Sequence, residues 1–247
     1  MSSLDLNADL GEGVGDDAAM LHIVSSANIA CGGHAGDEAS MRVALRAAKA
    51  RGVVVGAHPG FPDRENFGRK RMVLPPEELD AAIRAQVRSL VELGEVEGWP
   101  VRYVKLHGAL ANMAAEEPAI AALCFAAVEG LVEDMAILAI DNSAQADVAE
   151  ALGFRVVREA YADRAYQPNG LLVARQMPGA VLHDRAAITE RALRLAQRGE
   201  IVAADGTVIA TTGRSLCIHG DTPDAVEIAR AVKDGLAAAG VEIRAAL

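Results

Sequence analysis

The chain repeats one structural unit from end to end, and this repetition constrains its fold more than any other feature. In each unit a short apolar or β-branched run ends in polar residues and glycine, and a helical pattern follows. The unit occurs about seven times without a linker, with expected strands at 4–9, 26–31, 53–57, 101–106, 136–140, 155–159 and 215–218. Alternating strands and helices of this kind indicate a parallel α/β fold.

Polar tips follow nearly every expected strand, which favours a closed (β/α) barrel over an open doubly wound sheet. In a barrel all strand C-termini meet at one mouth, whereas an open sheet uses mainly the tips at its switch point. We therefore predict a single domain over residues 1–247, a parallel barrel of seven strands rather than eight. The Asp205-Gly206 pair between two alternating runs predicts a small β-hairpin insertion near 201–211.

Start and stop signals delimit the helices between the strands. Asp37 is a candidate N-cap for a helix that ends at Gly52. Ser143 is a candidate N-cap for the helix that follows it, and Thr222 and Pro223 start the last helix. These signals are local, so they predict where helices begin and end but not what they pack against.

Bulk composition excludes several classes of protein. Apolar residues make up 51% and charged residues 23%, so the chain can bury a substantial core. The net charge of −10 and the lack of a Lys/Arg-rich run argue against a nucleic-acid surface. The N-terminus has no signal-peptide pattern, and no stretch approaches the roughly 18 uninterrupted apolar residues of a membrane span. We therefore expect a soluble cytoplasmic protein.

The three cysteines are too widely spaced for a disulfide framework or a CxxC metal site. Cys31 could act as a nucleophile because His34 lies nearby in sequence, but catalytic Cys–His pairs are placed by the fold and not by adjacency. We expect Cys31 to be a small, buried, inert residue at a strand end, and Cys124 and Cys217 to belong to the core.

Four of the six histidines follow an apolar strand: His34, His58, His107 and His219. A single histidine at such a position is usually structural, but four in equivalent places indicate that at least two belong to a site. Near neutral pH they can act as acid, base or metal ligand. The other two, His22 and His183, lie away from the strand tips and are expected to be structural.

Two expected strands carry polar residues in alternation, so that both can point toward the barrel axis. Asn7 alternates with Asp9, and an inward carboxylate at a strand end suits a general base or metal ligand. The alternative is that Asp9 caps a turn or pairs with a lysine. Lys105 alternates with His107, and a lysine inside a barrel needs an anionic partner or a task such as stabilising an oxyanion or phosphate.

The strand tips together supply the candidate site. Arg164 can either pair with Asp163 or hold a substrate carboxylate with both arms of its guanidinium group, and these alternatives stay open. We predict catalytic roles for Asp9, His34, His58, Lys105 and His107. The candidates for substrate binding are Asn7, Glu12, Asn28, Asp37, Arg69, Glu159, Asp163, Arg164, His219 and Asp221.

Six blocks in the same order resemble the LamB/YcsF family, the proteins that form the A subunit of 5-oxoprolinase: LNADLGEG, ANIACGGHAGD, GAHPGFPDRENFGR, KLHGALAN, EAYADRAY and IHGDTPDAV. The chain departs from the family pattern at Leu106, where proline is usual, and at Ala111, where tyrosine is usual. Both flank His107 without removing it. The resemblance implies a glycosidase/deacetylase-like barrel and a part in ATP-dependent hydrolysis of 5-oxo-L-proline to L-glutamate with partner subunits B and C.

Two other functions remain open from the residues alone. One is a metal-dependent deacetylase or amidohydrolase that works alone, with Asp9, His34 and His58 as ligands of a divalent metal. The other is a non-catalytic subunit that binds 5-oxoproline and presents it to partners. The sequence contains no GxxxxGK[ST] phosphate loop, so an ATP site cannot be located in this chain.

Overall fold

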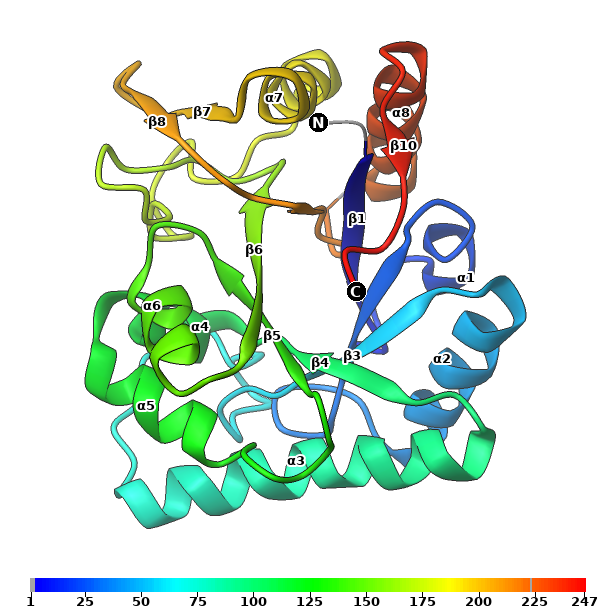
Figure 1. Ribbon diagram of the computed structural model, residues 1–247, viewed down its shortest axis with the longest axis vertical. Helices are drawn as coiled ribbons and strands as arrows, with labels where there is room; N and C mark the ends of the chain where they lie inside the picture. The colour runs from blue at the N-terminus through cyan, green and yellow to red at the C-terminus, as the bar shows by residue number, and fades with distance from the viewer. Residues whose placement is uncertain (1–2, 223) are drawn as a thin grey trace.

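Seven parallel strands close into a barrel in the computed structural model, which describes residues 3–222 and 224–247 (Figure 1). Neighbouring strands pair in chain order from β1 to β6, and β9 lies between β6 and β1 and closes the ring. The prediction of a seven-stranded parallel barrel is confirmed. The barrel strands are β1 (Ser3–Leu10), β2 (Ser26–Ala30), β3 (Val54–His58), β4 (Val101–Val104), β5 (Ala136–Ile140), β6 (Arg155–Tyr161) and β9 (Ser215–Cys217).

Helices surround the barrel, and the longest of them, α3, runs along one side of the molecule (Figure 1). Within the described ranges, no helix is long and apolar enough to cross a membrane. The helices are α1 (Asp17–Met20), α2 (Glu38–Arg51), α3 (Pro76–Glu97), α4 (Gly108–Glu116), α5 (Pro118–Ala126), α6 (Ala144–Ala151), α7 (Arg185–Arg198) and α8 (Ala225–Ala238).

Local signals set the helix ends largely as predicted. Asp37 caps α2, because its side chain accepts a backbone N–H of the first turn at 2.8 Å, and Gly52 ends α2 with a φ of 69°. Ser143 precedes α6 but does not cap it, because its hydroxyl donates to the Ile140 carbonyl at 2.6 Å. Pro223, predicted to start the last helix, lies outside the described residues.

Three short strands lie outside the barrel ring. The predicted hairpin insertion consists of β7 (Glu200–Val202) and β8 (Val208–Ala210), which pair antiparallel at the edge of the molecule (Figure 1). The third, β10 (Glu242–Ile243), pairs with the start of β1. After β10, Ala246 and Leu247 pack against a small apolar cluster from β4, β5 and β6 at the N-terminal end of the barrel. The functional side chains gather at the other end.

The two faces of the barrel strands have different chemistry. Alternate residues of β1, such as Leu6 and Ala8, join the apolar core, while Asn7 and Asp9 belong to buried polar networks inside the barrel. A glycine admits one large side chain to that interior, because a Cβ on Gly56 would lie 2.1 Å from the ring of Tyr103. The barrel interior is thus packed with polar groups that bond to one another.

Candidate functional site

A cavity of about 280 Å³ opens at the C-terminal end of the barrel. It is lined by side chains from the ends of β1, β3 and β6, from α4, and from the loops after β3, β4, β6 and β9, as expected where the strands of a barrel converge. The polar lining residues are Asp9, His58, Arg69, Arg71, His107, Asn112, Glu116, Tyr161, Arg164, Gln167, Arg175, Gln176 and His219.

Asp9 lines this cavity and is held by a buried network. Its Oδ1 accepts from Nζ of Lys105 at 3.2 Å and from Nδ2 of Asn28 at 2.8 Å. Burial alone would raise the pKa of Asp9, but His58 and Lys105 outweigh burial and hold that pKa well below its usual value. Asp9 therefore presents a carboxylate anion to the cavity.

Lys105 does not line the cavity, in contrast to the predicted role beside a substrate oxyanion or phosphate. Its side chain is 2% exposed, and its Nζ lies 3.2 Å from both Asp9 Oδ1 and Glu159 Oε2. The ammonium also contacts Asn7 Oδ1 at 3.2 Å and Cys217 Sγ at 3.0 Å. Burial opposes its charge, but these carboxylates raise the pKa of Lys105 well above its usual value. Its position suits a cation that fixes Asp9.

His219 and Asp163 form a pair beside the cavity. Nδ1 of His219 lies 2.9 Å from Oδ1 of Asp163, and the backbone N–H of His219 donates to the other carboxylate oxygen at 3.1 Å. Because a carboxylate accepts hydrogen bonds, Nδ1 of His219 is the donor in this pair. The ring also stacks on Tyr161 with centroids 5.5 Å apart. A histidine oriented by a buried carboxylate in this way can serve as a general base.

Arginines surround the cavity in different states of pairing. Asp221 bridges two of them, since its carboxylate lies 2.5 Å from Nη2 of Arg69 and 3.0 Å from Nη2 of Arg175. Arg164 is buried and donates to two backbone carbonyls of the loop after β6, at 3.2 and 2.8 Å. In the described part of the chain it forms no ion pair within 4.0 Å. Its guanidinium group is therefore the cation best suited to a ligand carboxylate.

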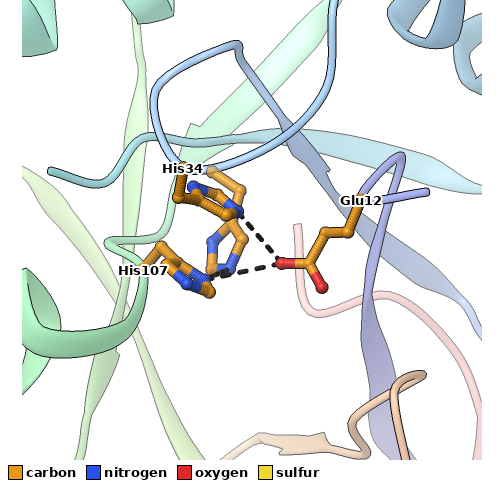
Figure 2. A group of neighbouring side chains, drawn as sticks. Glu12, His34 and His107 are labelled. Carbon is orange, nitrogen blue, oxygen red and sulfur yellow. Dashed lines mark hydrogen bonds and ion pairs between the residues drawn. The ribbon is translucent and has the colours of Figure 1, made fainter. Parts of the chain in front are cut away.

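A second group of side chains, the imidazole cluster, adjoins the cavity and consists of Glu12, His34, His58 and His107. Figure 2 shows Oε1 of Glu12 between two of the rings, 3.0 Å from Nε2 of His34 and 3.5 Å from Nδ1 of His107. Nδ1 of His107 also lies 3.0 Å from Nε2 of His58. The His34 and His107 rings stack with centroids 3.5 Å apart and planes 4° from parallel.

Burial dominates the acid–base properties of this cluster. It lowers the pKa of His34 to about 2, assisted by His58, and it lowers the pKa of His107 well below its usual value. Burial and the nearby Asp9 raise the pKa of Glu12 to about 7. Burial also opposes the charge on His58, but Asp9, whose Oδ2 lies 3.5 Å from Nε2, outweighs it and raises that pKa.

The sequence-based candidates thus fall into distinct positions. The cavity itself is lined by six of them: Asp9, His58, Arg69, His107, Arg164 and His219. Behind it, and bonded to lining residues or to one another, lie Asn7, Glu12, Asn28, His34, Lys105, Glu159, Asp163 and Asp221. Asp37 stays apart, because its exposed side chain is used to cap α2. Of the suggested metal set, Asp9 and His58 lie 3.5 Å apart between Oδ2 and Nε2, and His34 and His58 also lie with Glu12 and His107.

Several lining residues were not anticipated. Tyr161 follows Glu159 by two positions in β6, so strand alternation could have indicated it. Arg175, Gln167 and Gln176 come from the long segment between β6 and α7, which has little regular structure. No spacing rule places side chains from such a segment. Leu106 and Ala111, the two departures from the family pattern, both line the cavity.

Comparison with known proteins agrees with this architecture. The sequence pattern of the LamB/YcsF family matches residues 4–247. The chain belongs to the LamB/YcsF family. It is 49% identical over 99% of both chains to the A subunit of 5-oxoprolinase from Mycobacterium avium (strain 104). A crystal structure of the lactam utilization protein from Thermus thermophilus has a TM-score of 0.92 and 42% identity, and the match covers 98% of this chain and 99% of that one.

More distant structures share only the fold. The family 4 carbohydrate esterase of Streptomyces lividans, solved with acetate, has a TM-score of 0.51 and 12% identity, with 98% of this chain and 91% of that one covered. The predicted resemblance to deacetylase barrels is therefore confirmed at the level of architecture. At this identity it carries no information on chemistry.

Proposed function

We propose that this protein is the A subunit of an ATP-dependent 5-oxoprolinase, which hydrolyses 5-oxo-L-proline to L-glutamate. The observation that carries the proposal is the end-to-end similarity to proteins named as this component of 5-oxoprolinase, at 49% identity over 99% of both chains. A structure named for lactam utilization matches over nearly the full length as well. The cavity supports the proposal because its volume of about 280 Å³ suits a single five-membered ring with one carboxylate.

The assembled enzyme would divide its work among subunits. The relatives are named as one lettered subunit of an enzyme, which implies others, and we propose that these are subunits B and C. This chain has no GxxxxGK[ST] loop, which favours a partner as the site of ATP binding. We place the complex in the cytoplasm, where ATP is available.

The chemistry demands activation of an unreactive bond. Amide resonance makes a lactam carbonyl a poor electrophile, so transfer of the terminal phosphoryl group of ATP to its oxygen would supply a leaving group. Water can then attack the ring carbon, and the bond from that carbon to nitrogen breaks as the nitrogen takes up a proton, which opens the ring to an acyl phosphate. A second water attacks the acyl phosphate, releases phosphate and leaves L-glutamate.

Residues of this chain would position the lactam and move protons. Arg164 lacks an ion-pair partner among the described residues and would bind the substrate carboxylate. His219, oriented by Asp163, would take a proton from the attacking water at Nε2. Asp9, anionic and fixed by Lys105, would stabilise positive charge that develops on His219.

The test is ATP-dependent glutamate release from 5-oxo-L-proline, measured for this protein alone and with subunits B and C. We expect release only in the complete mixture. Arg164→Lys should mainly raise KM, because lysine loses the planar fork, and His219→Gln should lower kcat by about 10²–10⁴-fold. His183→Ala, at an exposed position that does not line the cavity, is the control. Wild-type rates in both site variants would contradict the assigned roles, and no release in the complete mixture would contradict the function.

A further inference from the structure

The imidazole cluster contains a contact between two ring nitrogens that a pair of neutral histidines cannot satisfy. Nδ1 of His58 lies 2.8 Å from the backbone carbonyl of Lys105, and Nε2 of His107 lies 2.9 Å from the backbone carbonyl of Phe67. A carbonyl only accepts, so each of these nitrogens carries the proton of its ring. The other two nitrogens, Nε2 of His58 and Nδ1 of His107, then hold lone pairs and face each other at 3.0 Å. The contact therefore requires either a second proton on His58, which the nearby Asp9 favours, or a metal ion between the two nitrogens.

The spacing of the donor atoms fits a metal ion better than a single proton. Glu12, His34, His58 and His107 each offer one ligand atom, all within 4.8 Å of one another. Three of the separations within the cluster are 3.0, 3.0 and 3.5 Å. Ligands on a tetrahedral zinc-type ion lie about 3.3 Å apart, given bonds of about 2.0–2.1 Å. A proton would join only one pair, whereas an ion can be shared by all four groups.

Two of the three histidines in the cluster are held as metal-binding histidines usually are. Backbone carbonyls fix the orientation of His58 and His107 from behind, which is the usual arrangement for histidine ligands. Nδ1 of His34 is buried and lacks a hydrogen-bond partner among the described residues. Two glycines admit the stacked rings, since a Cβ on Gly60 would lie 3.0 Å from His34 Nδ1 and one on Gly68 would lie 2.7 Å from His34 Cβ.

We propose that Glu12, His34, His58 and His107 bind one divalent transition-metal ion beside the cavity. Three imidazoles and one carboxylate favour an ion of the zinc or cobalt type over magnesium or calcium, which prefer oxygen ligands. His58 and His107 also line the cavity, so the ion borders the space for the substrate. A Lewis acid there would draw charge from a carbonyl or phosphoryl oxygen. That catalytic use rests on the proposed function, whereas metal binding itself does not.

The test uses untagged full-length protein, freed of metal by a chelator and titrated with Co²⁺, Zn²⁺ or Mg²⁺ alone. Isothermal calorimetry should give one Co²⁺ or Zn²⁺ per chain and no comparable Mg²⁺ binding, and bound Co²⁺ should give a visible absorption band. Losing a hydrogen bond that supports a metal ligand costs about 10–100-fold in metal affinity, and losing the ligand itself costs more. Glu12→Gln and His107→Ala should therefore each weaken Co²⁺ binding by more than about 100-fold. His183→Ala, which removes an exposed histidine, should bind Co²⁺ as wild type does.

A folding control and a second variant keep the outcomes distinct. Circular dichroism shows whether each variant is folded, and Glu12→Gln offers a second, nearly isosteric test if His107→Ala unfolds. Absence of stoichiometric Co²⁺ and Zn²⁺ binding, or binding that both cluster variants retain, would overturn the proposal and leave a shared proton between His58 and His107. Metal binding without 5-oxoprolinase activity would uphold the site and contradict the proposed function. 5-Oxoprolinase activity in protein that binds no metal would uphold the proposed function and contradict the metal site.

Discussion

Replacing Lys105 by methionine tests whether this lysine serves as the counter-ion of the barrel interior. The side chain is 2% exposed, and its ammonium lies 3.2 Å from the carboxylates of Asp9 and Glu159. Methionine keeps much of the volume and removes the charge, so both carboxylates lose their buried cation. Breaking a buried ion pair on one side costs about 3–5 kcal/mol. For a chain of this size that corresponds to a fall in Tm of roughly 6–20 °C.

The assay is a double-mutant cycle measured by urea unfolding at pH 7. Glu159→Gln alone should destabilise the wild type, but in the Lys105→Met background it should cost less or even stabilise, because it removes an uncompensated carboxylate. The expected coupling energy is about 0.5–3 kcal/mol. Lys70→Met makes the same chemical change at an exposed position and should stay within about 0.5 kcal/mol of wild type. Additive effects, or a Lys105→Met protein as stable as wild type, would refute the counter-ion role.

Two further predictions concern buried hydrogen bonds. Tyr103→Phe removes a hydroxyl that donates to Oδ1 of Asn28 at 2.7 Å. Because the buried Asn28 oxygen loses this donor, the free energy of unfolding should fall by about 1–3 kcal/mol. An unchanged urea midpoint would contradict this. Asp141→Asn should destabilise chiefly above pH 3.8. Burial would raise the pKa of Asp141, but bonds from Thr211 and Arg158 lower it overall, so the stability it contributes is present above the unfolded value of 3.8 and is lost as pH falls further. Unfolding measured at several pH values should show the gap to wild type closing in acid, and a gap that widens there would be inconsistent with this account.

The extent to which the sequence predicts this structure depends on the range of the interactions involved. The Asp37 cap and the Gly52 stop depend on contacts within one helical turn, and both are visible in the order of residues alone. Barrel architecture follows from the same unit repeated with few exceptions. Ser143 shows the limit of this reasoning, because its hydroxyl has a carbonyl three residues earlier as a competing partner.

The candidate site was harder to predict because its contacts join segments far apart in the chain. Alternation correctly placed Lys105 toward the barrel interior. It could not show that carboxylates from β1 and β6 would bind the ammonium inside the barrel, so that Lys105 does not reach the cavity. Likewise the strand-tip histidines could be recognised, but their grouping with Glu12 depends on how the loop after β1 folds back over the mouth. Arg175 reaches the cavity from an irregular segment, where no period constrains side-chain direction.

The charges at the mouth are compatible with the proposed binding of an anionic lactam by a strongly acidic protein. The net charge is −10, but charges farther than about 8–10 Å from a ligand are largely screened at physiological salt, so local groups decide. Four arginines line the cavity. Arg71 is paired with Glu116, while Arg69 and Arg175 share the single carboxylate of Asp221. Glu117 also lies 3.5 Å from Arg71, so it is Arg164 that keeps a cation without an ion pair among the described residues. A carboxylate that enters the cavity would exchange hydration for contacts with that guanidinium group, which backbone carbonyls already orient.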